Sequence, residues 1–207
     1  MTQKYLMELL GAFFLTLTVC LSGHPLAIGI MLMSLVYIGG HISGGHYNPA
    51  VTLAVWLRGK LTTAHVPGYI VCQVLGAFAA AGLFYLLAGK TFYPTPSSDI
   101  ILWQAILLEA LFTFIFCLVI LTVATSKKFV TNDIYGIAIG LTLFTAILSV
   151  GPTTGGVFNP AIGIGTIMLD LITGSGAGLK HLVLYIIGPS LGALGAAYTF
   201  KCLNPGE

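Results

Sequence analysis

The sequence predicts an all-α membrane protein with six transmembrane helices and two re-entrant half-helices arranged as an inverted repeat. Only 7% of its 207 residues are charged and 57% are hydrophobic, with a mean hydropathy of +1.00. Soluble domains carry roughly 25% charged residues. The tripeptide Asn-Pro-Ala occurs twice, at 48–50 and 159–161, in matching places of two similar halves.

The apolar segments divide into two length classes. Segments near the ~20 residues that a bilayer requires predict spanning helices. We expect these spans at about 4–22, 25–42, 66–88, 100–124, 133–151 and 180–200. The stretches 48–57 and 159–171 are too short to span and predict half-helices that end inside the membrane. Asn favours a helix N-cap and Pro the first helical position, so Asn48-Pro49-Ala50 and Asn159-Pro160-Ala161 should begin them.

The two halves correspond in sequence. Glu8 of the first span matches Glu109 of the fourth, and the Gly-rich stretch 44–48 matches 155–159. Three spans per half is an odd number, so the halves should lie inverted with respect to each other. We therefore expect one domain, 1–207, with repeats at about 1–89 and 100–207 and a site at their interface near the membrane centre.

The distribution of Lys and Arg predicts the orientation, since cytoplasmic loops carry more of them. With both termini in the cytoplasm, that side holds Lys4, Arg58, Lys60, Lys127, Lys128 and Lys201. Only Lys90 and Lys180 then lie outside. We expect a plasma (inner) membrane protein with cytoplasmic termini.

Two half-helices that meet at their N-termini predict a pore for neutral molecules. Each helix N-terminus carries roughly half a positive charge, which repels cations and protons. The amides of Asn48 and Asn159 can donate hydrogen bonds to an uncharged solute. Irregular backbone at membrane depth is tolerated only where it is buried in protein or lines a water-filled cavity. The loop carbonyls expected to face that lumen are those of Gly44, Gly45, His46, Gly155, Gly156 and Val157.

Three titratable residues near this site have alternative interpretations. Glu8 and Glu109 are costly in lipid unless partnered, so we expect each carboxylate to brace one loop through backbone N–H groups. The alternative is a proton relay, which would need more titratable groups along one path. His46 precedes Asn48 and either lines the mouth of the lumen or packs within the loop.

Several other functions lack support in the sequence. The four cysteines have no metal-ligand spacing, and we expect neither metal nor cofactor. No nucleophile–base pair or phosphate loop indicates an enzyme, so no catalytic residue is assigned. No basic cluster exceeds Lys127-Lys128, which argues against a nucleic-acid partner.

The chain resembles the aquaporin family, also called the major intrinsic proteins, over its whole length. HISGGHYNPAVT is similar to the family's first signature and GGVFNPA to its second, and Gly188-Pro189 also fits. The resemblance implies an aquaporin-like fold with one pore per subunit and a homotetramer in the lipid bilayer. It also implies passive conduction of water or small neutral solutes with exclusion of protons.

The resemblance also implies an unusual selectivity filter. Most members have Arg directly after the second Asn-Pro-Ala, where this chain has Ile162. Carried over by spacing, the other filter positions are Ile28, Ile147 and Gly156. Water-selective members place an aromatic residue and a His at the first two. The filter expected here is therefore wide, aliphatic and uncharged.

We expect a passive channel for water and small uncharged solutes. The alternatives are a facilitator mainly for larger neutral solutes (glycerol, urea, metalloid hydroxides) or for gases, and a coupled transporter. Gly163 stands where glycerol-type members usually have Asp, which weakens a simple assignment as a glycerol facilitator.

Overall fold

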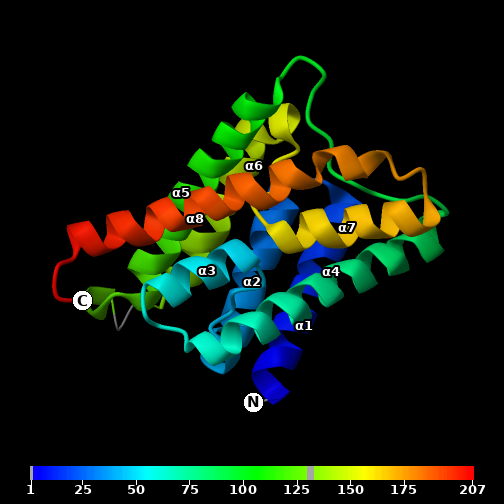
Figure 1. Cartoon of the computed structure of the whole chain (residues 1–207). Helices are drawn as coiled ribbons and strands as arrows, with labels where there is room; N and C mark the ends of the chain where they lie inside the picture. The colour runs from blue at the N-terminus through cyan, green and yellow to red at the C-terminus, as the bar shows by residue number, and fades with distance from the viewer. Residues whose placement is uncertain (1, 130–132) are drawn as a thin grey trace.

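The computed structural model describes residues 2–129 and 133–207, and this part of the chain is entirely helical apart from its connecting loops (Figure 1). The long helices are α1 (Thr2–Ser22), α2 (Pro25–Ser43), α4 (Val66–Ala88), α5 (Leu102–Thr125), α6 (Tyr135–Thr154) and α8 (Leu182–Leu203). The shorter helices are α3 (Pro49–Leu57), α7 (Pro160–Thr173) and the 3-10 turns η1 (Thr63–His65), η2 (Lys127–Phe129) and η3 (Ala177–His181).

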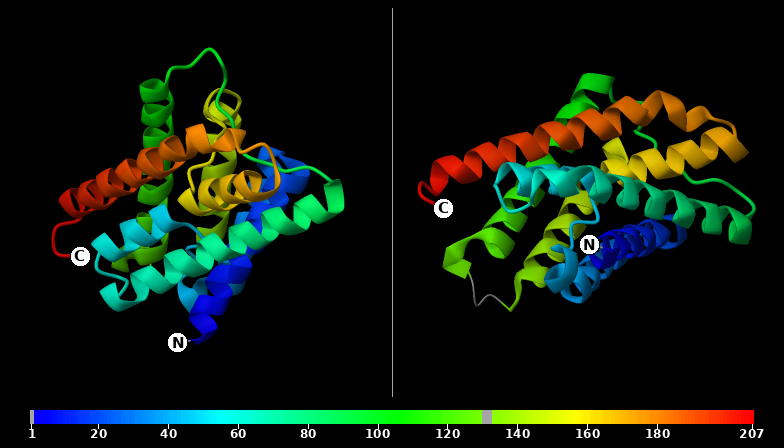
Figure 2. Two further views of the ribbon diagram at one scale, coloured as in Figure 1. Left: turned by 45° about the vertical axis from the view of Figure 1, so that its right-hand side comes forward. Right: turned by 60° about the horizontal axis from the view of Figure 1, so that its bottom comes forward.

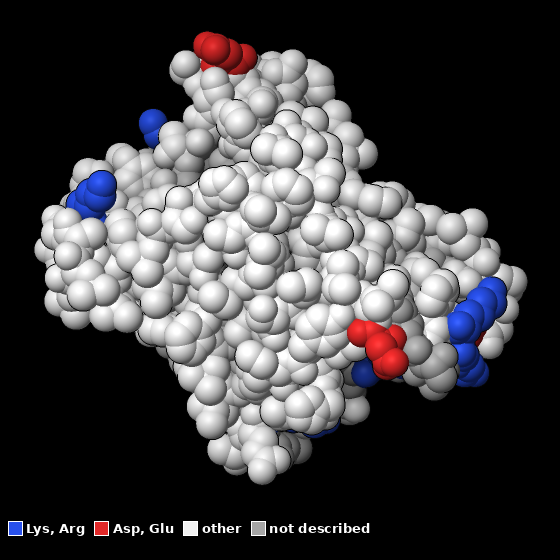
Figure 3. Space-filling model, turned by 180° about the vertical axis from the view of Figure 1, so that it is seen from behind, with Lys and Arg blue, Asp and Glu red and all other residues white. Residues whose placement is uncertain are grey.

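The predicted fold class is confirmed. Within the described residues, six helices are long and apolar enough to cross a membrane. The two half-helices begin at Pro49 and Pro160. The chain is therefore an integral membrane protein. The broad face in Figure 3 is nearly free of charged side chains, which gather toward its edges as contact with lipid requires.

Several boundaries differ from the approximate prediction by one to three residues. The fifth span was expected at about 133–151, whereas α6 runs from Tyr135 to Thr154 with Pro152 inside it. Membrane helices tolerate Pro because neighbouring groups satisfy the backbone that it frees. The helix ends instead at Gly155, whose φ of 95° is the left-handed conformation that glycine adopts without a steric penalty.

The helices pair in the same way in both halves. α1 packs along α4 and α5 along α8, while α2 of the first half packs on α6 of the second (Figure 2). A Cβ on Gly29 of α2 would stand 2.6 Å from the carbonyl oxygen of Gly140 on α6. The absence of side chains at these two positions lets the halves approach closely at the centre of the bundle.

The half-helices complete the bundle between the two sets of spans. In Figure 1, α3 and α7 point away from each other from a common region in the middle of the molecule. The far end of α3 is anchored by Arg58, whose guanidinium lies 3.2 Å from the Glu207 carboxylate and 4.7 Å from the Phe200 ring centroid. Arg58 thereby ties α3 to the end of α8.

Candidate pore and selectivity site

The loops that precede α3 and α7 have nearly the same backbone conformation. Gly44 and Gly155 both have φ of 95°, and Tyr47 and Phe158 have φ of 51° and 50°. Positive φ costs a non-glycine residue roughly 1–2 kcal/mol, so this geometry needs compensation. Tyr47 and Phe158 are both fully buried, and the Tyr47 hydroxyl donates to the carbonyl of Leu35 at 2.8 Å. Burial and hydrogen bonds therefore hold a strained turn before each Asn.

The first loop is held by the carboxylate of Glu8. Oε1 accepts from the Ser43 hydroxyl at 2.6 Å and from the His46 N–H at 3.0 Å. Oε2 accepts from the Tyr47 N–H at 2.6 Å and from Gln73 Nε2 at 2.7 Å. Each carboxylate oxygen thus has two donors, which replace the hydration that a buried acid loses.

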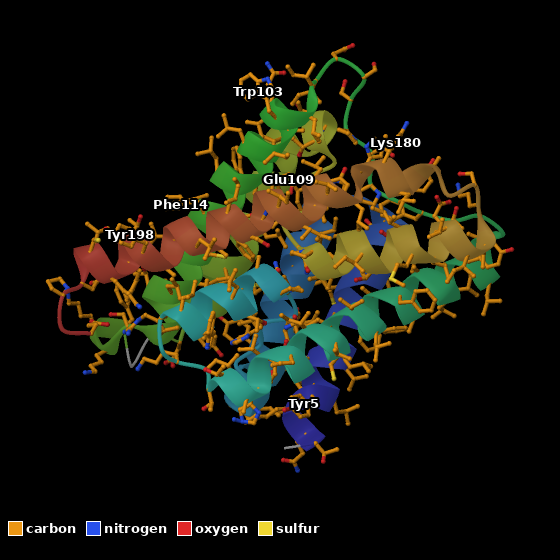
Figure 4. The ribbon with its side chains drawn as sticks, viewed as in Figure 1. Tyr5, Trp103, Glu109, Phe114, Lys180 and Tyr198 are labelled. Atoms are coloured by element: carbon orange, nitrogen blue, oxygen red, sulfur yellow. The ribbon has the colours of Figure 1, made fainter. Side chains whose placement is uncertain are left out.

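The second loop is held in the same way by Glu109, which lies in the middle of the molecule in Figure 4. Oε1 accepts from the Thr154 hydroxyl at 2.7 Å and from the Val157 N–H at 3.1 Å. Oε2 accepts from the Phe158 N–H at 2.8 Å. Thr154 Oγ1 in turn accepts from the Gly156 N–H at 3.1 Å. Each acid therefore contacts backbone N–H groups of one loop.

The two Asn side chains connect the halves of the chain. Asn48 Oδ1 caps α3 by accepting from the Ala50 N–H at 2.8 Å, and its Nδ2 donates to the Phe158 carbonyl at 2.9 Å. Asn159 Oδ1 accepts from the Ala161 N–H at 3.0 Å, and its Nδ2 donates to the Tyr47 carbonyl at 3.0 Å. Each amide nitrogen has two N–H groups, so one remains for a solute.

A cavity of about 190 Å3 ends on this pair of Asn residues. Among the residues that the structure describes, its polar side chains are those of His46, Asn48 and Asn159, and the remaining lining is apolar or glycine. The four filter residues from the sequence lie together on this cavity: Ile28 of α2, Ile147 of α6, Gly156 of the second loop and Ile162 of α7. No charged side chain of the described chain lines it.

The loop residues expected along one lumen separate in the structure. His46, Gly155, Gly156 and Val157 line the cavity, but Gly44 and Gly45 do not. Gly44 lines a second cavity of about 500 Å3 at the other end of α2, together with residues such as Lys60 and Tyr135. Gly45 turns into the protein, where its N–H donates to the Ser43 hydroxyl at 3.1 Å.

Sequence reasoning missed several lining residues, two of which lie in the same loop. Phe92 and Pro94, in the connection between α4 and α5, line the same cavity as the filter residues. That connection is fixed at one end by Thr91 Oγ1, which donates to Asp170 at 2.7 Å, and at the other by the Ser97 N–H, which donates to the Thr153 carbonyl at 2.9 Å. No sequence motif in this stretch points to the pore.

No metal site was found in the part of the chain that the structure describes, because its His, Cys, Asp and Glu residues form no group of three that could hold an ion. The described cysteines are all free thiols, with Cys20 and Cys117 buried. The geometry is that of a mostly apolar cavity with a few hydrogen-bond donors.

Comparison with known proteins identifies relatives over nearly the whole chain. Residues 15–200 match the family model described as major intrinsic protein. The chain is 39% identical to "Glycerol uptake facilitator protein-like 6" of Lactiplantibacillus plantarum, covering 98% of both chains. It is 34% identical to Nodulin-26 of Glycine max, over 98% of this chain and 78% of that one.

A solved structure has the same fold. The X-ray structure of the aquaglyceroporin from Plasmodium falciparum superposes with a TM-score of 0.81 at 22% identity, covering 99% of this chain and 96% of that one. At this identity the likeness bears on the fold alone.

Proposed function

The chain belongs to the major intrinsic protein family of membrane channels, and we propose that it conducts water and small uncharged solutes passively through a wide aliphatic filter. The observation that carries this proposal is the cavity lined by Ile28, Ile147, Gly156 and Ile162, which ends on Asn48 and Asn159. Pore width and lining donors determine which solutes pass such a channel. This filter has no side-chain donor to replace the hydration of water, and no cation.

The centre of the pore supports exclusion of cations and protons. α3 and α7 begin at the paired Asn residues, so two positive helix ends point toward the same place. A neutral solute accepts hydrogen bonds from the free Asn N–H groups, whereas a cation is repelled. Because Ile162 replaces the usual Arg, this central barrier carries the exclusion without help from the filter.

Coupled transport has less support than passive conduction. A proton-coupled mechanism needs titratable groups along the path. Glu8 and Glu109 do not line the cavity, and donors occupy both oxygens of each. An enzyme activity is likewise not part of the proposal, since the relatives found are channels and facilitators.

The choice between a water channel and a facilitator of larger solutes needs a flux measurement. Proteoliposomes are examined by stopped-flow light scattering, with water and glycerol flux measured on the same preparation. We expect glycerol flux well above that of empty liposomes. Fast water flux without glycerol flux would contradict the wide filter. Absence of both would contradict the proposal for these permeants and leave gases or metalloid hydroxides to be measured.

We further propose a homotetramer in the plasma (inner) membrane with both termini in the cytoplasm. The excess of Lys and Arg on that side supports the orientation. Cys202, exposed near the end of α8, provides a test. A membrane-impermeant thiol reagent should label it only from the cytoplasmic side, and native mass spectrometry reports the subunit number.

A further inference from the structure

We propose that Gln73 and Thr52 are positioning residues that hold His46 as the Nε2–H tautomer, so that its ring donates a hydrogen bond to solutes in the pore. The three side chains form a chain of contacts that starts at Glu8 and ends at the cavity. The direction of each hydrogen bond follows from the one before it.

The carboxylate of Glu8 fixes the orientation of the Gln73 amide. Gln73 Nε2 lies 2.7 Å from Glu8 Oε2 and 2.9 Å from Thr52 Oγ1. Reversing the amide would place its carbonyl oxygen against an oxygen that already accepts from the Tyr47 N–H at 2.6 Å. Two acceptors in contact repel each other, so the NH2 group must face Glu8 and Thr52.

The amide in turn fixes the direction of the Thr52 hydroxyl. Thr52 is fully buried, and its oxygen accepts one N–H from Gln73. Its own hydrogen needs an acceptor, since a buried hydroxyl without one loses the hydrogen bond that water would supply. Within the described chain, its remaining side-chain partner is His46 Nδ1 at 3.1 Å. Thr52 therefore donates, and His46 Nδ1 accepts.

The tautomer of His46 follows directly. A neutral imidazole carries one N–H, so an accepting Nδ1 places the hydrogen on Nε2. The His46 ring is also held by Tyr69, whose ring centroid is 5.2 Å away. Among the described residues Nε2 has no protein hydrogen-bond partner. This N–H is therefore free for a solute.

His46 is placed where both cavities approach. It lines the cavity that ends at Asn48 and Asn159, and its Nε2 would lie 3.0 Å from a Cβ on Gly44, which lines the second cavity. The missing side chain of Gly44 thus leaves room beside the donor. With this tautomer, the polar side chains on the described wall of the first cavity can all donate N–H groups to a solute oxygen. A ring nitrogen that already carries its hydrogen does not accept a proton from passing water.

The second repeat lacks this arrangement. Aligning the two Asn-Pro-Ala motifs places Val157 opposite His46 and Gly163 opposite Thr52. Pro189 occupies the place of Gln73. None of these three can form the contacts described, so the donor belongs to one half of the pore only.

The tautomer is measurable by solid-state NMR of the full-length protein in liposomes with 15N-labelled histidine. We expect His46 to show a non-protonated Nδ1 and a protonated Nε2. The signal is assigned by its loss in His46→Gln or, if that variant does not fold, in a chain whose other four histidines are replaced by Asn. Thr52→Val should shift the tautomer ratio about fivefold, the effect of one net hydrogen bond. Thr52→Ser should retain the wild-type signal.

Thr113→Val is the matched control, because Thr113 has a fully buried hydroxyl without a hydrogen-bond partner in the structure. It should leave the His46 signal unchanged. A protonated Nδ1 in the wild type, or a Thr52→Val spectrum equal to the wild type, would overturn the proposed chain of contacts.

The donor role rests on the proposed channel function and is tested by glycerol flux. Thr52→Val should lower the glycerol flux about threefold relative to Thr52→Ser. This decrease is somewhat smaller than the full effect of one hydrogen bond. Unchanged flux with an altered tautomer would overturn the donor role. No flux in the wild type would contradict the channel function for glycerol while the NMR result stands by itself.

Discussion

The loop before α3 and the loop before α7 have the same backbone and different side chains. Both contain a turn with positive φ, at Tyr47 and at Phe158, and both are held by a buried Glu. The first loop carries His46, which continues into a polar network, whereas the second carries Val157. The side chains that line the cavity can therefore differ between the two repeats, while the turn that positions each Asn residue is retained.

The two carboxylates that hold the loops, Glu8 and Glu109, also differ in their hydrogen bonds. Glu8 accepts four hydrogen bonds, including one from Gln73, whereas Glu109 accepts three. Pro189 stands in the place of Gln73 and has no amide to offer. The first loop is thus held by more hydrogen bonds than the second, and the second contributes Gly156 to the proposed filter.

The largest expected effect comes from removing either brace. Glu8→Ala leaves four donors without this acceptor and Glu109→Ala leaves three. Each buried unsatisfied donor costs about 1–3 kcal/mol, so both variants should fold poorly, and Glu8→Ala more so. Yield of monodisperse protein and thermal unfolding in detergent measure this. Well-folded variants with altered selectivity, or a larger loss at Glu109, would contradict the brace interpretation.

A smaller effect should distinguish the glycines of the two loops. Gly45 and Gly156 have φ of 65° and 61°, so Ala is strained at both. A Cβ on Gly156 would stand 2.8 Å from the Cα of Gly151, whereas on Gly45 the nearest atom is 3.5 Å away. Overpacking costs about 1–3 kcal/mol, so Gly156→Ala should lower Tm more than Gly45→Ala. Equal decreases in Tm for the two variants would show that the positive φ alone determines the loss of stability.

A charged side chain at Ile162 tests how wide the pore is where α7 and the second loop line it. Ile162→Arg should lower the ratio of glycerol to water flux about tenfold, equivalent to about 1.4 kcal/mol in barrier height. The guanidinium would narrow the passage and supply donors for water. Ile162→Met, which stays uncharged, is the control and should change the ratio little. An unchanged ratio in a folded Ile162→Arg channel would count against Ile162 lining the filter.

The smallest expected effect lies outside both loops. Phe92 lines the cavity from the connection between α4 and α5, so Phe92→Ala should widen it. We expect glycerol flux to rise about threefold, a change of less than 1 kcal/mol in barrier height. Thr95→Ala, at an exposed position of the same connection, is the control. A rise in both variants would point to loosening of the connection and not to the Phe92 side chain.

The sequence was sufficient for the elements that local chemistry dictates. The apolar spans, the two Asn caps and the correspondence of Glu8 with Glu109 are visible as patterns. The positions of Phe92 and Gly45 could not be predicted, because they depend on how a loop folds back over helices that are distant in the chain. The continuation of α6 past Pro152 was not predicted either, since the effect of this Pro depends on neighbours that sequence alone does not identify.

The crossed hydrogen bonds of Asn48 and Asn159 have a consequence for how the protein matures. Each Asn caps the helix of its own half through Oδ1, but its Nδ2 is held by a carbonyl of the other half, at 2.9 Å and 3.0 Å, so neither half supplies both contacts alone. During synthesis the first half enters the bilayer before the second exists. An early intermediate therefore lacks these two cross-contacts, and the pair of Asn residues is fully held only after both halves have docked.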